Sequence, residues 1–247
     1  MIPPSPGPTA SEQAYGGPLY DTQPGVTAHA ETKAKANPSA EFDRLVGGNV
    51  HFDKAPDEIM LPQAAQKGMQ EEWDASKQGT PGVQEHGGNL VRNHDGKSNY
   101  AWRSGKPGND QMYSPDYDDV GKGQKLVGVG HTHPYENGKE NVSFSGEDIS
   151  SIVDETSPIN LLQSGKTQYV IARTAEFEAS LKRLDEDGKE KLKHTIEGTW
   201  YAAFGADSRT LPDGLYQQRV ERAVRVTCAT FDLAYYSGQG GTLKHVV

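Results

Sequence analysis

Two histidines at alternate positions give this sequence its clearest chemical signal. The segment Gly130-His131-Thr132-His133-Pro134 points both imidazoles to one side of an extended backbone, because successive side chains of a strand alternate between its faces. Pro134 favours an extended conformation at His133. Two neutral imidazole nitrogens that face one point are typical zinc ligands. We therefore expect a metal site at the end of a strand.

Asp148 can supply the third ligand of such a site. It follows His133 through a loop and lies in the first turn of a helix expected over residues 147–155, with Ser145 as the N-cap. Two histidines and one carboxylate lower the pKa of a zinc-bound water and leave the fourth coordination position open. These residues predict a hydrolytic zinc site.

Hydrolysis also needs a base that takes a proton from the attacking water and a donor that stabilises the oxyanion. Glu85 precedes Gly87 and Gly88, which let the backbone approach closely before an expected strand, and we assign it as the general base. Ser145 is assigned to the oxyanion. Alternatively, Glu85 is an exposed turn carboxylate and Ser145 only caps a helix.

A series of strands and helices must bring these residues together. Residues 125–130 are a compact apolar run, typical of a buried central strand, that leads into His131. Residues 88–92 and 98–102 predict a hairpin with its turn at residues 93–96. A further strand is expected over residues 169–172. Apolar spacing predicts helices over residues 61–73 and 215–236, the latter ending at Gly238, whereas residues 175–195 form two helices or a charged hairpin.

The N-terminal segment differs in composition from the rest of the chain. Residues 1–40 are rich in Pro, Gly, Ala, Thr and Ser, so they cannot offset the entropy cost of folding by burying apolar side chains. We expect an extended arm or linker over residues 1–40 and one domain over residues 41–247.

Charge and apolar content restrict the class of partner. The chain has 25 Lys and Arg against 34 Asp and Glu, a net charge of -9, and we find no basic stripe, which argues against a nucleic-acid partner. No stretch has the length of a membrane span and the N-terminus lacks a secretory signal. We expect a soluble protein made in the cytoplasm, and export by a machine that needs no signal peptide stays compatible with this sequence.

The remaining reactive side chains carry simpler interpretations. Cys228 is the single cysteine and lies on the apolar face of the expected C-terminal helix, which predicts a buried thiol. Residues 116–119 predict an acidic loop, because the spacing of a calcium loop is missing. Four histidines are expected to be solvated and without partners: His51, His86, His94 and His194.

The candidate catalytic residues occur in a known order. Glu85, then His131-Thr132-His133-Pro134, then Ser145-Gly146-Glu147-Asp148 resembles the motif of the JAB/MPN (JAMM) metalloproteases. Residues 85–88 and 143–149 are closer still to the JAB-like domains of the DUF4329 type, found in bacterial polymorphic toxins and secreted effectors. The resemblance covers about residues 80–175.

This resemblance implies an α/β (α+β) fold of the cytidine-deaminase-like type, with a curved mixed sheet flanked by helices. It implies Zn2+ bound by His131, His133 and Asp148, with Glu85 as the general base and Ser145 at the oxyanion. The implied activity is peptidase or isopeptidase cleavage of a protein or peptide-like substrate. The toxin-type likeness adds a role as an effector, for example of type VI secretion, with an immunity protein or a secretion component as partner. The alternative is an inactive JAB/MPN-like scaffold or binding module.

One feature departs from the usual motif. The segment between His133 and Asp148 is a few residues longer, through the insertion-like residues 135–141. The position of Asp148 relative to the two histidines therefore depends on how this loop folds.

Overall fold

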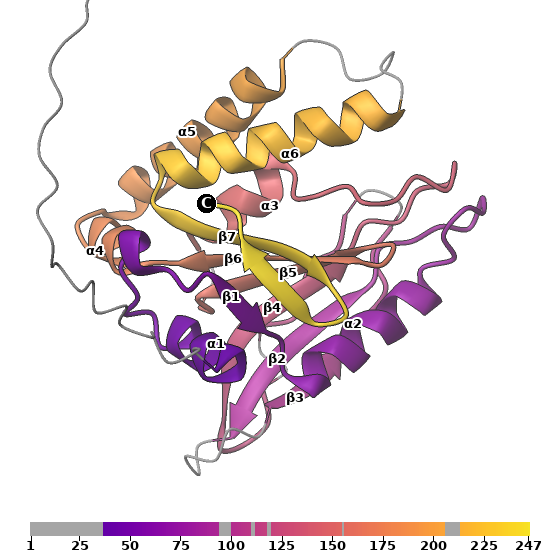
Figure 1. Ribbon diagram of the computed structural model, residues 1–247, viewed down its shortest axis with the longest axis horizontal. Helices are drawn as coiled ribbons and strands as arrows, with labels where there is room; N and C mark the ends of the chain where they lie inside the picture. Colours follow the sequence, from indigo (N-terminus) through magenta and orange to yellow (C-terminus); the bar gives the residue numbers. More distant parts are fainter. Residues whose placement is uncertain (1–36, 94–99, 110–111, 118–119, 155, 206–212) are drawn as a thin grey trace, which may run out of the picture. The chain divides into compact units, whose positions relative to one another are not determined.

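The computed structural model describes residues 37–93, 100–109, 112–117, 120–154, 156–205 and 213–247 (Figure 1). The helices are α1 (Pro38–Val46), the short 3-10 helix η1 (Phe52–Lys54), α2 (Gln63–Ala75), α3 (Gly146–Ser151), α4 (Ala175–Leu181), α5 (Glu186–Phe204) and α6 (Asp213–Thr230). The strands are β1 (Glu58–Met60), β2 (Gly87–Asn93), β3 (Tyr100–Ser104), β4 (Gln124–Thr132), β5 (Ile159–Ser164), β6 (Thr167–Arg173), β7 (Leu233–Gln239) and β8 (Thr242–His245).

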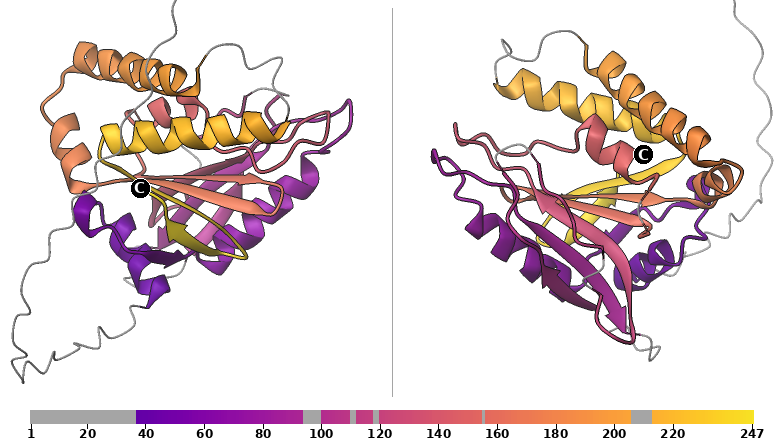
Figure 2. Two further views of the ribbon diagram at one scale, coloured as in Figure 1. Left: turned by 45° about the horizontal axis from the view of Figure 1, so that its top comes forward. Right: turned by 180° about the vertical axis from the view of Figure 1, so that it is seen from behind.

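The strands form one mixed sheet of eight strands in the order β1-β8-β7-β6-β5-β4-β2-β3, and the sheet is curled (Figure 2). All neighbouring strands are antiparallel except β4 and β5, which run parallel. The protein is therefore a mixed α/β protein with a curled mixed sheet, as expected. The specific cytidine-deaminase-like fold stays a prediction.

Helices cover both faces of this sheet (Figure 2). On one face, α3, α5 and α6 enclose a core that includes Tyr169 and Ile171 of β6, and on the other face α1 and α2 enclose a second core that includes Val170 and Ala172. Alternate residues of one strand thus enter different cores, as the two-residue period of a strand requires. Burial on both faces explains why the middle of β4 and the middle of β6 read as continuous apolar runs.

Most of the expected elements are present. The apolar run at residues 125–130 lies within β4, in the interior of the sheet, and the helix expected over residues 61–73 is α2. The expected hairpin is the antiparallel pair β2 and β3, whose turn lies largely outside the described residues. Residues 175–195 fall in two helices, α4 and α5, which decides between the two alternatives. None of the described helices is long and apolar enough to cross a membrane.

The prediction of a helix over residues 215–236 is wrong at its C-terminal end. Helix α6 ends at Thr230, and Leu233–Gln239 forms β7 between β6 and β8. Asp232 has a positive φ of 53°, which turns the chain out of the helix. The apolar residues after this turn pair with β6 and are buried on both faces of the sheet, so tertiary pairing overrides the helical spacing.

Two other boundaries also differ from the predictions. Helix α3 ends at Ser151, four residues before the expected end at residue 155. Helix α1 begins at Pro38, with Asn37 as its N-cap, within the last few residues of the range 1–40 where we expect an arm. Residues 1–36 lie outside the described part of the chain.

Candidate metal centre

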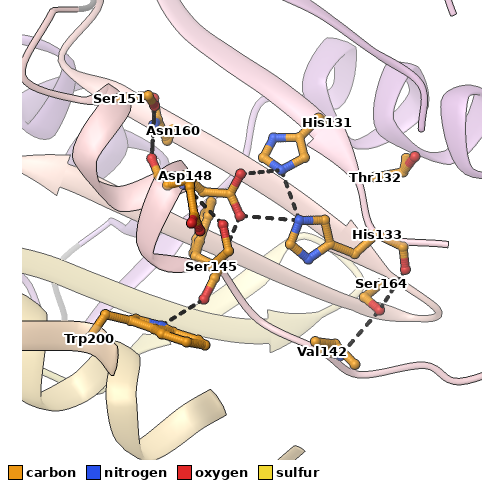
Figure 3. A network of polar contacts seen from close by, with 12 residues as sticks. His131, Thr132, His133, Val142, Ser145, Asp148, Ser151, Asn160, Ser164 and Trp200 are labelled. Atoms are coloured by element: carbon orange, nitrogen blue, oxygen red, sulfur yellow. Dashed lines mark hydrogen bonds and ion pairs between the residues drawn. The ribbon is translucent and has the colours of Figure 1, made fainter. Parts of the chain in front are cut away.

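The C-terminal end of β4 presents the two histidines of the motif. His131 pairs with Gly87 of β2, and the next residue, Thr132, donates its backbone N–H to the carbonyl of His86 (2.8 Å). His133 lies just beyond the strand, where its N–H donates to the carbonyl of Gln163 in β5 (3.0 Å). The extended geometry therefore continues through His133, and both imidazoles lie on the side of the sheet that carries α3 (Figure 3).

Helix α3 presents the third residue of the set. Ser145 is its N-cap: the Ser145 hydroxyl accepts a hydrogen bond from the Asp148 N–H (3.1 Å), and the Asp148 carboxylate accepts one from the Ser145 N–H (2.7 Å). This reciprocal pair is a capping box, which fixes the side chain of Asp148 relative to the helix start. The expected cap at Ser145 is thus confirmed, and one Asp148 oxygen serves both the cap and the site.

The three side chains converge on one point (Figure 3). The Nε2 atoms of His131 and His133 lie 3.1 Å apart, and each lies 3.2 Å from a different oxygen of Asp148. A tetrahedral zinc ion with bonds of about 2.0–2.2 Å separates its ligand atoms by about 3.3–3.6 Å, close to these values. These residues are the one described group of three or more His, Cys, Asp or Glu side chains whose ligand atoms could hold a metal ion. The expected ligand set therefore fits a metal ion.

Electrostatics at this point favour the ionised form of Asp148, which is the form that binds a metal ion. Burial alone raises the pKa of Asp148, but the charges of His131 and His133 and their hydrogen bonds hold it well below its ordinary value. Asp148 is therefore an ionised carboxylate between two imidazoles, as a cation site requires. The Nδ1 atom of His133 is buried and has no hydrogen-bond partner among the described residues.

Glu85 lies beside these three residues but is not part of the ligand group. It is 8% exposed, so it is not an exposed turn carboxylate. Burial, the largest effect, raises the pKa of Glu85, and the charges of His133 and His131 lower it to a smaller extent. A buried carboxylate with a raised pKa that interacts electrostatically with two histidines is suited to accept and return a proton.

A loop after β3 holds Glu85 in place. The Glu85 N–H donates to the carbonyl of Asn109 (2.6 Å), its carbonyl accepts from the Gly108 N–H (2.8 Å), and its carboxylate accepts from the backbone N–H of Tyr113. The Tyr113 ring lies against Gly87, where a Cβ atom would come within 2.7 Å of the ring and 2.2 Å of a backbone oxygen. The close approach that we expected at this glycine is therefore present.

Strand β5, which the sequence analysis missed, ties both ligand-bearing segments to the sheet. The Asn160 side chain donates to the carbonyl of Asp148 (3.2 Å), and the Ser164 hydroxyl donates to the carbonyl of His133 (3.2 Å). Ser164 also accepts the N–H of Val142 (3.2 Å), at the return of the inserted loop. The signal available was three apolar residues, Ile159, Leu161 and Leu162, interrupted by Asn160, which does not show that β5 lies beside β4.

His51 and His194 are exposed to solvent, as expected, with side chains that are 58% and 71% exposed, but each lies near a carboxylate that was not predicted. His86 is largely buried beside Glu72, so the prediction that it is solvated is wrong. The side-chain nitrogen-to-oxygen distances are 2.7 Å for His51 and Glu176, 3.5 Å for His86 and Glu72, and 3.4 Å for His194 and Glu190. His94 lies outside the described residues, as do positions 118 and 119 of the acidic loop. Cys228 is fully buried, as expected, and burial raises the pKa of its thiol.

No protein-family model, no curated protein and no solved structure matches this chain. The function of the site is therefore inferred from its own residues and geometry.

Proposed function

We propose that this protein is a zinc-dependent hydrolase of amide bonds, a peptidase or isopeptidase of the JAMM type. The observation that carries the proposal is the convergence of His131, His133 and Asp148 at 3.1–3.2 Å, with the buried carboxylate of Glu85 beside them. A bound zinc ion would polarise the substrate carbonyl and lower the pKa of a water molecule. The role as a secreted bacterial effector remains a prediction from the sequence resemblance.

The side chains divide the work of hydrolysis among them. His131, His133 and Asp148 would hold the metal ion, and the capping box keeps Asp148 in its position. Glu85 accepts the proton of the attacking water and returns it to the leaving amine, because its raised pKa brings it closer to neutral pH. Ser145, at the start of α3, donates its hydroxyl hydrogen to the oxyanion, since its oxygen already accepts the Asp148 N–H.

Metal content tests the centre before a substrate is known. We expect about one zinc ion per chain in the wild type by elemental analysis and none in His131→Ala, because a site needs its third protein ligand. His194→Ala is the matched control, since that histidine lies in α5 with a side chain that is 71% exposed. If the wild-type protein binds no metal after incubation with zinc, the proposed metal centre is refuted.

Glu85→Gln separates metal binding from catalysis. This variant keeps the shape of the side chain and loses its basicity, so it should retain zinc and no longer cleave peptides. Cleavage is measured by mass spectrometry on a proteome-derived peptide mixture. Full cleavage by Glu85→Gln contradicts the role of Glu85. Zinc bound to the wild type without cleavage of any amide favours the inactive scaffold.

A further inference from the structure

Thr132 lies between the two histidine ligands and joins their strand to the segment that carries Glu85. Its backbone N–H donates to the carbonyl of His86 (2.8 Å), and its hydroxyl donates to the same carbonyl (3.2 Å). The hydroxyl also accepts the backbone N–H of His86 (3.0 Å). An ordinary antiparallel pair of this kind exchanges two backbone hydrogen bonds, so the Thr132 hydroxyl takes the place of a backbone carbonyl. Thr132 is 1% exposed, and water therefore has little access to these bonds.

The same pairing places Glu85 on the side of the sheet that carries the metal ligands. The antiparallel register of β2 and β4, continued by the bonds described above, sets Thr132 opposite His86. The next positions outward are therefore Glu85 and His133. Residues opposite each other in antiparallel strands share a face, and successive residues alternate between faces. His133 lies on the side of α3 (Figure 3), so this register directs Glu85 to that side as well.

The other face of the pair is held by α2. The imidazole Nδ1 of His86 lies 3.5 Å from a carboxylate oxygen of Glu72, which also accepts the indole N–H of Trp102 (3.1 Å). Both side chains of the ion pair are largely buried. The side chain of His86 is thus fixed from below, and its backbone N–H is fixed by Thr132.

Beyond Thr132 and His86 the two segments follow different neighbours. His133 donates its N–H to Gln163 of β5, whereas both backbone groups of Glu85 bond to the loop after β3. The Thr132 hydroxyl therefore lies where the metal-binding strand and the segment with the base begin to part. A displacement of about 1 Å in a catalytic group can lower a rate by about 100-fold, so the spacing set at this point matters for catalysis.

We infer that Thr132 is a positioning residue: its hydroxyl sets the position of the Glu85 carboxylate relative to the metal centre. This inference rests on the proposed function. Thr132→Val keeps the shape of the side chain and removes the hydroxyl, which leaves the His86 N–H without its partner. The segment then shifts to find another acceptor, and Glu85 moves with it. The ligand Asp148 is held separately by the capping box, so the metal ion should still bind.

Cobalt-substituted full-length protein tests this role without a known substrate. Cobalt(II) absorption reports metal occupancy first, and its change with pH then follows the ionisation of the water on the metal. A carboxylate close to that water titrates together with it, so the midpoint belongs to the pair. Glu85→Gln should therefore displace the midpoint by about 1 pH unit or more. We expect Thr132→Val to keep full cobalt occupancy and to displace the midpoint toward that of Glu85→Gln.

Two further variants serve as controls. Thr132→Ser keeps the hydroxyl and should keep the wild-type midpoint, which a role of the side-chain shape alone does not predict. Thr227→Val is the matched control, because Thr227 of α6 is fully buried and its hydroxyl has no partner among the described residues. Its midpoint should equal that of the wild type.

The outcomes separate this inference from the proposed function. A wild-type protein that takes up no cobalt, or whose spectrum does not change with pH, overturns the proposed hydrolytic centre and this inference with it. A wild-type midpoint in Glu85→Gln overturns the role of Glu85 as the base, and again the inference with it.

The role of Thr132 alone is overturned in either of two ways. One is a displaced midpoint in Glu85→Gln beside a wild-type midpoint in Thr132→Val; the other is a midpoint in Thr132→Ser displaced as far as in Thr132→Val. If Thr132→Val does not fold, Thr132→Ala decides, because it removes the hydroxyl without placing a methyl group against the His86 N–H. A wild-type midpoint in that variant then overturns the inference.

Discussion

Gly130 shows how tightly the structure around the metal centre is packed. An alanine Cβ at this position would lie 2.6 Å from Cη2 of Trp102 and 3.2 Å from Cβ of Leu161. Trp102 has little room to move, because its side chain also fills the space beside two other glycines: a Cβ at Gly68 would lie 2.0 Å from it and one at Gly88 2.8 Å. We therefore expect Gly130→Ala to force a change in the backbone of β4.

The magnitude follows from two opposing effects. Overpacking a well-packed core lowers the free energy of unfolding by about 1–3 kcal/mol. Replacing a strand glycine by alanine recovers about 0.5–1 kcal/mol, because the unfolded chain loses conformational freedom. The difference between these two effects centres on a net loss of about 1 kcal/mol, which corresponds to a fall in Tm of about 2–4 °C for a domain of this size. His131 is the next residue, so cobalt affinity should fall by about 10-fold, as when a residue that supports a ligand is altered.

Thermal unfolding followed by circular dichroism in EDTA measures the first effect, and cobalt titration measures the second. Gly198→Ala in α5 is the matched control: the site is exposed with no neighbouring atom within 4 Å of the new Cβ, so its Tm should rise by about 1–4 °C. A Tm of Gly130→Ala at or above that of the wild type refutes the packing argument. The penalty should shrink in a Trp102→Leu background, where the ring no longer fills the space.

Two further predictions concern the support of the site and a distant ion pair. Ser164→Ala leaves the His133 carbonyl and the Val142 N–H without their buried partner. The free energy of unfolding, measured by urea titration, should therefore fall by about 1–3 kcal/mol. An unchanged free energy of unfolding would contradict the supporting role of β5. The hydrogen bond from His51 lowers the pKa of Glu176 to about 2, so the stability from this carboxylate is present above the ordinary glutamate pKa and is lost as the pH falls through about 2. Because the pair is exposed, Glu176→Gln should lower the free energy of unfolding by less than about 1 kcal/mol at pH 6, and by a still smaller amount at pH 3. An equal or larger decrease at pH 3 would contradict this prediction.

The parts of the site that the sequence predicts are those set by local chemistry. The apolar run that ends at His131, the alternation of the two histidines and the cap at Ser145 are each determined within a few residues. Strand β5 was missed because its three apolar residues show neither a continuous run nor a regular alternation, although all six of its residues are buried. The roles of Asn160 and Ser164 depend on the parallel pairing of β4 with β5, which no local pattern contains.

The C-terminal region illustrates the opposite error. Residues 215–236 have helical apolar spacing throughout, and the periodicity alone gives no reason to end the helix at Thr230. The register of β7 against β6, with Tyr235 opposite Ile171 and Tyr236 opposite Val170, decides instead. The two tyrosines enter different cores, which only a strand between two helical layers allows.

The longer segment between His133 and Asp148 is compatible with a metal centre because β5 holds both of its ends. His133 bonds to Gln163 and Ser164 at one end, and Asn141 and Val142 return to Ser164 at the other. The residues between them leave the sheet and come back to the same strand, so their number does not change where the chain resumes. Closing a longer loop adds only slowly to the entropy cost of folding.

The path after this return is fixed by burial. Val142 and Phe144 are almost fully buried in the core beneath α3, and Trp200 of α5 donates to the carbonyl of Phe144 (3.1 Å) one residue before the Ser145 cap. Asp148 therefore takes its position from β5, α5 and the capping box, and not from the length of the loop. The loop is in consequence free to differ in length from the usual motif without disturbing the ligands.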